Sequence, residues 1–572
     1  MKISIAFYIR VGKCYTVPMR KKWKDNGIDL LSGGLLMLAA VICFLLSFKY
    51  VWGDDIWYDE VFSMGFIKED IRGLAALTAM DVHPPFYYIY LKAVVTVICS
   101  AFDGIGAVQA AKIASLLPWI GLMALAVFPL RKSRGYLTAG LFLLLVSAMP
   151  QITAYYTEIR MYSLALLLVT CQIMLSVKIA GEVIYNGRVR VIYPVLYVIV
   201  GIITAYIQYY ACIAVAGSYI ALVCLILLYG GDSRRRARGG VLGCAVISVI
   251  LYVPWLPKLK SQMDNISGNY WIQPLTLKSI GGCAKYLTLP VVDISPVIRY
   301  AAAGCILLAI LYISILYLKG VNKGSIDNEG SNNVIGKNGD KYDITRRYTI
   351  NSGLKSEAWM PSAGIYDIII MLCTLMPLVI VVISGFVLSA MGTPIFVYRY
   401  MIPAAGGLWL YIATGVNKER RVAIRMLLVC AFIAVCALNM KGYCLEEQKK
   451  TDQAGIAGEA LARIPNGSVI VTNFDHVTAV MGERMRNDRV ILYDNEIDRL
   501  IPMMYGNVSD GLTDDELKEL LDAGERVYFF GSFNSREDIV DHWRELKIGS
   551  ELTDSIMVER YWINIYRLYN AY

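Results

Sequence analysis

The feature that most constrains this chain is a series of apolar runs, each about 20 residues long. A helix needs about 20 consecutive apolar residues to cross the hydrocarbon core of a bilayer. The first run, Leu30 to Tyr50, is long enough and follows a basic lead at residues 1–29. Because cytoplasmic flanks of membrane helices are rich in Lys and Arg, we expect a retained first helix with a cytoplasmic N-terminus.

Further apolar runs follow along most of the chain. Their approximate bounds are 108–130, 136–153, 161–180, 191–207, 211–230, 240–256, 297–318, 365–390, a run that ends before Lys418, and 422–440. Basic turns such as Arg131 to Arg134 and Arg234 to Arg238 then fall on the cytoplasmic side. An earlier apolar run that ends at Phe102 is interpreted as a helix lying in the membrane interface, because a full span there would put Arg131 outside. The sequence predicts a polytopic α-helical membrane protein with about 11 transmembrane helices.

The loops divide the chain into parts of different character. We expect a transmembrane domain at residues 30–440, with a first outer loop at 51–107 and a flexible cytoplasmic loop at 319–364, which is rich in Gly, Asn, Ser and Lys. Residues 445–572 are different in kind and are expected outside. Short buried strands are predicted at 468–472, 489–493 and 526–530, and a helix with a capping box begins at Thr513. Strands alternating with helices predict a small extracytoplasmic α/β domain.

Composition argues against two classes of site. The net charge is +9, but Lys and Arg concentrate in short loops between apolar runs, so we expect contact with membrane lipids and no nucleic-acid binding. The 13 cysteines lie mostly within apolar runs and there are only three histidines. We therefore predict neither disulfides nor a zinc site built from Cys or His.

Four polar clusters fall on the outer face in this topology. Asp59 and Glu60 follow the first span, His83 lies in the first outer loop, Glu158 and Arg160 follow the third span, and Arg399 follows the ninth. Charged side chains are costly inside the hydrocarbon core and mark functional sites when they gather near it. Chance would divide these clusters between the two faces, so the sequence predicts a site at the outer surface.

The same clusters lie in short ordered motifs. These are Trp57 to Ser63, His83 to Tyr88, Tyr156 to Tyr162, and Arg399-Tyr400. Together they resemble the GT-C glycosyltransferase superfamily, and most of all the bacterial branch with protein mannosyltransferases, aminoarabinose transferases and rhizobial lipopolysaccharide sugar transferases. The resemblance covers roughly residues 30–440. It implies that a sugar moves, with inversion, from a polyprenyl phosphate carrier to an extracytoplasmic glycan, lipid or protein of the cell envelope.

The resemblance also implies roles for single residues. Asp59 matches the general base of the first loop, Glu60 would orient Asp59 or the acceptor, and Glu158 matches the second acidic motif. Donor phosphate would be bound by Arg160 and Arg399, helped by His83 and by Lys112, where many relatives have Arg. The expected substrate pocket contains Trp57, Tyr58, Tyr87, Tyr162, Tyr398 and Tyr400.

No cofactor is firmly predicted. If the enzyme used a divalent cation, Mg²⁺ or Mn²⁺, Asp59 and Glu158 would hold it together with water and phosphate. The branch with the protein mannosyltransferases manages without a metal, and this chain has no richer acidic cluster, so the sequence favours no metal.

Two other classes of function stay open at this point. A transporter or flippase of polyprenyl-linked glycans would place ionisable residues near the middle of spans and show repeated halves, and neither feature is present. A scaffold with an outer binding domain would not need Asp59. The Lys that aminoarabinose transferases carry beside the proline pair is absent from His83-Pro84-Pro85, so the transferred sugar cannot be copied from that branch.

Overall fold

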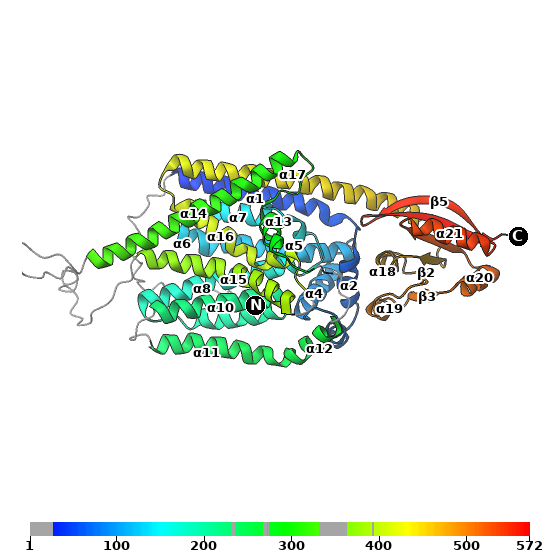
Figure 1. Cartoon of the computed structure of the whole chain (residues 1–572), viewed down its shortest axis with the longest axis horizontal. Coiled ribbons are helices and arrows are strands. Elements are labelled where there is room, and N and C mark those ends of the chain that lie inside the picture. Colours follow the sequence, from blue (N-terminus) through cyan, green and yellow to red (C-terminus); the bar gives the residue numbers. More distant parts are fainter. Residues whose placement is uncertain are drawn as a thin grey trace, which may run out of the picture.

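The computed structural model describes residues 27–229, 235–266, 272, 274–330, 363–391 and 394–571 of the 572-residue chain. A bundle of long helices forms one end of the molecule, and a twisted sheet with flanking helices forms the other (Figure 1). Most of the basic lead predicted at 1–29, namely residues 1–26, and most of the predicted cytoplasmic loop, at 331–362, lie outside the described residues.

Helices account for the chain as far as Leu461. They are α1 (Gly27–Lys49), α2 (Tyr58–Phe66), α3 (Ile71–Met80), α4 (Phe86–Ala101), α5 (Ala107–Leu125), α6 (Arg131–Arg134), α7 (Tyr136–Ala148), α8 (Tyr162–Asn186), α9 (Ile192–Ala205), α10 (Tyr209–Tyr229), α11 (Arg235–Tyr252), α12 (Leu256–Ile266), α13 (Leu277–Thr288), α14 (Pro296–Gly330), α15 (Ala363–Met391), α16 (Ile402–Lys418) and α17 (Val422–Leu461). Short irregular helical segments lie between them, including η1 (Tyr50–Trp52), η3 (Thr153–Tyr156) and η7 (Tyr398–Met401).

Eight of the described helical segments are long and apolar enough to cross a membrane. They include α1, α5, α8, α10, α11, α14, α15 and α17. The other three predicted spans correspond to shorter helices, α7, α9 and α16, of 13, 14 and 17 residues. The chain is therefore a multi-pass helical membrane protein, and the count of about eleven spans stays a prediction.

The short helices α7 and α16 form the centre of the bundle. Every side chain from Leu137 to Ala148 in α7, and from Ile402 to Val416 in α16, is buried. A helix that is apolar on all sides is buried either in a protein core or in lipid, and here the burial is by neighbouring parts of the protein. α7 packs most extensively on α1. A Cβ atom on Gly140 would lie 2.3 Å from the carbonyl oxygen of Gly33, so these two glycines let the backbones touch.

Two helices extend beyond the predicted spans. α14 continues to Gly330, past the expected end near residue 318. α17 continues from the predicted span to Leu461 as one 40-residue helix and joins the bundle to the sheet (Figure 1). It thereby carries Glu447 and Lys450 toward the end of the bundle that faces the sheet.

The C-terminal part contains one six-stranded sheet in the order β3-β2-β1-β4-β6-β5. The strands are β1 (Val469–Thr472), β2 (Arg489–Tyr493), β3 (Val508–Leu512), β4 (Val527–Ser532), β5 (Ile548–Val558) and β6 (Tyr561–Asn570), and the helices are α18 (Asp475–Arg484), α19 (Leu500–Met504), α20 (Asp514–Asp522) and α21 (Ser535–Glu545). The first four strands are parallel, and the β5–β6 hairpin is antiparallel. The predicted small α/β domain is confirmed.

Three strands and one helix of this domain match the prediction. β1, β2, β4 and α20 lie where buried apolar runs and the Thr513–Glu516 capping box predicted them. The other strands were not predicted. β3 and most of β5 have exposed, polar residues between a few buried ones, because they form the two edges of the sheet, so they lack a continuous apolar run.

The sheet domain is held against the bundle through α2. Lys68, just after α2, forms an ion pair with Glu483 of α18 at 2.7 Å, and the hydroxyl of Tyr505 donates to the carbonyl of Val61 at 2.7 Å. A Cβ atom on Gly65 would lie 2.5 Å from the sulfur of Met504, so this glycine allows close packing. These contacts place the domain directly against α2.

Basic side chains gather at the other end of the bundle. The turn of α6 lies at the end that is farther from the sheet (Figure 1). There Arg134 is hydrogen-bonded to Tyr366 and Lys418 pairs with Asp367. The polar clusters predicted for the outer face therefore belong to one end of the bundle, and this basic group belongs to the opposite end.

Candidate active site

Asp59 and Glu60 lie in the first turn of α2. Trp57 is extended, and the second carboxylate oxygen of Glu60 accepts from its backbone N–H at 3.0 Å, which starts the helix at Tyr58. Acidic residues are favourable in this turn because its N–H groups have no partner within the helix. The local sequence therefore forms a short helix that begins with two adjacent carboxylates.

Glu60 joins two of the sequence motifs through backbone hydrogen bonds. Its first carboxylate oxygen accepts from the N–H of Ile159 at 2.6 Å, while the second accepts from Trp57. The residue is only 3% exposed, and burial raises its pKa to about 8. Because both oxygens accept from the backbone, Glu60 aligns the Asp59 turn with the Glu158 turn.

We expect Glu60→Ala to destabilise the protein. The substitution leaves the N–H groups of Trp57 and Ile159 without their acceptor, which costs about 1–3 kcal/mol for each buried group. Glu60→Gln keeps one carbonyl oxygen and should have a smaller effect. Thermal unfolding in detergent checks this, with exposed Glu446→Ala as the control. Equal melting temperatures for Glu60→Ala and wild type would contradict this role.

Asp59 lies between two arginines that come from distant parts of the chain. Its Oδ2 atom is 3.0 Å from Nη2 of Arg399, on η7, and 3.8 Å from Nη2 of Arg160, which follows η3. Arg160 is also fixed by donating from Nη1 to the backbone carbonyl of Asp59 at 2.9 Å. Arg160 is 4% exposed and Arg399 and Asp59 are each 21% exposed, so this centre is shielded but reachable.

The side chain of His83 contacts Arg160. Nη2 of Arg160 lies 3.3 Å from Nε2 of His83, and Nδ1 of His83 lies 2.9 Å from a carboxylate oxygen of Asp81. A guanidinium can only donate, so Nε2 accepts and Nδ1–H donates to Asp81. Asp81 and His83 therefore position Arg160, and the predicted direct contact of His83 with phosphate has no support in this geometry.

Glu158 is a carboxylate near this centre that lacks a hydrogen bond. Its Oε1 atom is buried and has no hydrogen-bond partner in the described structure. Burial raises the pKa of Glu158 to about 7, although the positive charge of Arg399 opposes the shift and that of Lys450 opposes it more weakly. A group that changes its protonation state near neutral pH is well suited to proton transfer.

Lys112 belongs to a separate ion pair. Its Nζ atom is 2.7 Å from Oδ1 of Asp55 and 2.9 Å from the carbonyl of Gly53. The residue is 3% exposed and anchors the loop between α1 and α2 onto α5. Its charge is paired with Asp55 and not with Asp59, so its predicted role in phosphate binding would need this pair to open.

The predicted aromatic residues surround the arginines in different ways. The guanidinium of Arg399 lies 5.6 Å from the ring centre of Trp57, within the range of a cation–π contact. The ring of Tyr58 stacks on His476 of the sheet domain at 3.9 Å. Tyr400 stacks on Tyr210 at 4.6 Å, and Tyr398 lies 6.0 Å from Tyr286. Tyr87 and Tyr162 are completely enclosed.

Several buried polar atoms around Asp59 have no hydrogen-bond partner in the described structure. They include Oδ2 of Asp59 itself, Oε1 of Glu158, Nε of Arg160, Nε of Arg399, and the hydroxyl groups of Tyr88 and Tyr162. More than nine in ten buried polar groups in proteins are hydrogen-bonded, so a concentration of exceptions marks a place suited to a polar ligand. Here most of these atoms are donors, which suits an anionic or oxygen-rich ligand.

The residues do not fit a divalent cation. Asp59 and Glu158 are the predicted ligands, but Asp59 already pairs with Arg399, and Arg160 is close by. Two guanidinium groups repel a metal ion, and among the described residues no group of three or more His, Cys, Asp or Glu side chains is arranged to hold one. The positive charge at this centre comes from arginine.

The structure brings four residues to the site that sequence reasoning missed. Asp81 supports His83, Lys450 of α17 acts on the charge of Glu158, and His476 and Glu559 come from the sheet domain. Glu559 accepts from the backbone N–H of Tyr58 at 2.6 Å. Asp81 was within reach of the motif analysis, since it lies two residues before His83. No local pattern pointed to the other three.

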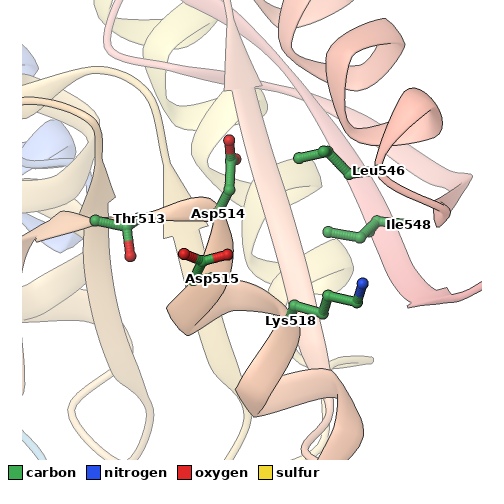
Figure 2. Close-up of a pocket in the computed structure, with 6 residues that line it drawn as sticks. All are labelled: Thr513, Asp514, Asp515, Lys518, Leu546 and Ile548. Atoms are coloured by element: carbon green, nitrogen blue, oxygen red, sulfur yellow. The ribbon is translucent and has the colours of Figure 1, made fainter.

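Two surface pockets lie away from this centre. One is lined by Phe128, Pro129, Arg131, Lys132 and Tyr136 at the basic end of the bundle. Figure 2 shows the other, between the start of α20 and the turn before β5, where Asp514, Asp515 and Lys518 face Leu546 and Ile548. α20 is at the end of the domain away from the bundle (Figure 1), so this pocket is remote from Asp59.

Comparison with known proteins gives a likeness in structure alone. No family model matches the sequence, and no curated protein matches it. The crystal structure of ArnT from Cupriavidus metallidurans in the apo state matches with a TM-score of 0.51 and 13% identity, covering 94% of this chain and 98% of that chain. The structure of ArnT bound to undecaprenyl phosphate matches with a TM-score of 0.50 and 11% identity, over the same shares of both chains.

The likeness covers the helical bundle and the sheet domain together, because it includes nearly all of both chains. This chain therefore has the fold of the solved ArnT structures.

Proposed function

We propose that this protein is a membrane glycosyltransferase that moves a sugar from a polyprenyl phosphate carrier to an extracytoplasmic acceptor, with inversion at the anomeric carbon. The acceptor would be a glycan, lipid or protein of the cell envelope. The observation that carries the proposal is the Asp59–Arg399–Arg160 centre, with a carboxylate 3.0 Å from one guanidinium and 3.8 Å from another.

The two charges suit the two halves of the reaction. The acceptor hydroxyl loses its proton to Asp59 while its oxygen bonds to the anomeric carbon. On the opposite side of that carbon, the bond to the phosphate oxygen breaks and the phosphate leaves with the electron pair. Arg399 and Arg160 would stabilise the added negative charge on the phosphate. In this scheme Asp59 takes the proton of the acceptor, and the two arginines stabilise the charge of the leaving phosphate.

The arginines would change partners when donor binds. With no donor bound, Asp59 balances the charge of Arg399 and leaves no isolated buried cation. A lipid phosphate can accept a bidentate bond from each guanidinium, which would release the carboxylate toward the acceptor. Binding of the donor would in this way prepare the base, with Asp81 and His83 keeping Arg160 oriented.

The donor class has support from the fold. A solved structure with this fold is that of ArnT bound to undecaprenyl phosphate. Identity to it is 11%, so we carry over the class of carrier and not the sugar. The absence of Lys beside Pro84 and Pro85 also speaks against copying the sugar from aminoarabinose transferases.

We place the reaction on the extracytoplasmic side. α6, with its basic turn, lies at one end of the bundle, and α2, which carries Asp59, lies with the sheet domain at the other (Figure 1). Cytoplasmic loops carry the excess of Lys and Arg in membrane proteins. In this orientation the N-terminus is cytoplasmic and the domain at 445–572 is outside, where it would help to position the acceptor.

We expect Glu158→Gln to stabilise the protein at alkaline pH. Burial raises the pKa of Glu158 from 4.5 to about 7, so the folded state favours its protonated form. This stabilisation is complete below pH 4.5 and is lost as pH rises through 7, by up to about 3 kcal/mol. Gln is neutral at every pH, so Glu158→Gln does not lose this stabilisation as pH rises. Between pH 5.5 and pH 8, the melting temperature should therefore fall more for wild type than for Glu158→Gln.

The exposed acid Glu446 supplies the control for this pH dependence, as Glu446→Gln should melt like wild type at both pH values. Parallel losses in wild type and Glu158→Gln between pH 5.5 and 8 would show that Glu158 titrates in its ordinary range.

The proposed function is tested by following labelled sugar in membranes. Membranes from cells that carry or lack the protein are supplied with extracted lipid-linked sugars that bear a radiolabel on the sugar. We expect label to move from the lipid-soluble carrier to a different product only when the protein is present. If the label crosses the membrane while still on its carrier, the protein is a flippase. If the label neither crosses nor leaves its carrier, the remaining interpretation is a non-catalytic scaffold.

A further inference from the structure

A partly exposed group of rings borders the active site on the sheet domain. We call it the aromatic ledge, and it consists of Phe474, His476, Phe533 and Tyr561. The ring of Phe474 lies 4.9 Å from each of the other three rings. Phe533 is 48% exposed, while the other three are half-buried. The ledge is therefore a surface with an exposed apolar ring at its edge.

The ledge is continuous with the reacting centre. His476 stacks on Tyr58 with ring centres 3.9 Å apart and planes only 4° from parallel. Tyr58 immediately precedes Asp59 in α2, and its backbone N–H is held by Glu559. The charge of Asp59 acts on both Tyr58 and His476, so a ligand on the ledge lies near the proposed base.

The ledge lies where ligands commonly bind to open α/β sheets. Phe474 follows β1 and Phe533 follows β4, and these neighbouring strands are the point where the strand order reverses. Asn473 joins the two strand ends, donating to the carbonyl of Ser532 at 2.9 Å and accepting from its N–H at 2.7 Å. Phe533 has a φ angle of +58°, which is unusual for a bulky residue and is often retained at binding sites.

Carboxylates accompany the rings. Glu559 lies 3.8 Å from Nδ1 of His476, and Asp475 is the next residue along from Phe474. Asp498 and Asp475 both act electrostatically on Tyr58. This arrangement offers flat apolar faces beside hydrogen-bond acceptors. Arginines are present too, since Arg560 acts on Tyr561 and Arg499 acts on Asp498. The largest charge effects on Tyr58 and His476 nevertheless all come from carboxylates, so this side of the ledge disfavours anions.

These properties match the chemistry of a sugar ring. A pyranose has one face of C–H groups, which packs on aromatic rings, and a rim of hydroxyl groups, which donate to carboxylates. A phosphate or uronate would meet unfavourable charge at Asp475 and Glu559. The match is to neutral or amine-bearing sugars.

We propose that the aromatic ledge binds a carbohydrate portion of the acceptor, made of neutral or amine-bearing rings, and presents its hydroxyl group to Asp59. This inference rests on the proposed function, since it names the acceptor of that reaction. The acceptor is then a glycan or glycoconjugate and not a bare lipid or an unmodified protein.

Ligand-observed saturation-transfer NMR on the full-length protein in nanodiscs tests the inference. The probes are maltotetraose, tetrameric chitosan and tetragalacturonate at equal concentrations. We expect transfer to the first two and little to the third. Phe533→Ala should weaken the affinity for the bound probes about tenfold. Trp562→Ala is the matched control, because Trp562 is 60% exposed on the same hairpin as Tyr561 but alternates to the other face.

The outcomes separate this inference from the proposed function. Binding that is unchanged by Phe533→Ala, or is lost in Trp562→Ala instead, overturns the ledge as the glycan site, as does preferential binding of tetragalacturonate. Labelled-sugar transfer that persists in that case would leave the proposed function standing. If probe binding depends on Phe533 but the protein transfers no sugar, the ledge is a glycan site and the proposed reaction is wrong.

Discussion

Replacing Asp59 by Asn is expected to lower sugar transfer about 10²- to 10⁴-fold, the usual range for loss of a general base. Asn has nearly the same shape but cannot take a proton from the acceptor. Arg399, which is 3.0 Å from the carboxylate in the wild type, would lose its charge partner and become freer to bind phosphate. Transfer should therefore collapse while binding of undecaprenyl phosphate is kept or improved.

Transfer rates and undecaprenyl phosphate binding are measured on the same preparations at matched protein levels. Asp54→Asn is the control, since Asp54 is exposed in the neighbouring loop and pairs with Gln109. Asp59→Asn with wild-type transfer would exclude Asp59 as the base and direct attention to Glu158. Loss of both transfer and carrier binding would mean that the charge of Asp59 is needed to organise the arginines.

Replacing Arg399 by Gln is expected to lower transfer about 10²- to 10³-fold, as found when one donor to a developing oxyanion is removed. Arg399 is the more exposed of the two arginines beside Asp59, so it is the one that an incoming phosphate reaches first. Unlike Asp59→Asn, this change should also weaken undecaprenyl phosphate binding. Arg399→Lys keeps the charge but loses the bidentate fork, and should fall between Gln and wild type.

Arg420→Gln is the control for charge alone, because Arg420 is exposed after α16, beside Lys418 and Glu419 at the basic end of the bundle. If Arg399→Gln impaired transfer and left carrier binding at the wild-type level, Arg399 would serve only to hold Asp59. The opposite patterns in Asp59→Asn and Arg399→Gln thus assign the base and the phosphate contact separately.

Adjacent residues show how far sequence reasoning reached into the site. The motif Trp57 to Ser63 identified both Asp59 and Glu60 as candidates. Successive residues of an α-helix point about 100° apart, so the two acids must face different surroundings. Which one faces the arginines depends on where α2 is packed. In the structure Glu60 is enclosed by backbone N–H groups and Asp59 faces Arg399.

The basic residues make the same point. Arg160 and Arg399 were predicted as the main phosphate ligands, and Lys112 was predicted to help them because many relatives have Arg there. Packing separated them, placing Lys112 on Asp55 and the two arginines on Asp59. The pairing of His83 with Asp81 and Arg160 depends in the same way on how two loops meet.

The sequence by itself determined the membrane class, the order of the helices and three inner strands of the small α/β domain. It could do so because apolar length and periodicity reflect burial of a single element against lipid or core. Only the tertiary structure decided that α2 carries the sheet domain, that α17 continues into it, and that Phe474, Phe533 and Tyr561 meet beside Tyr58. These are contacts between distant segments, and their geometry depends on the packing of the whole chain rather than on any local pattern.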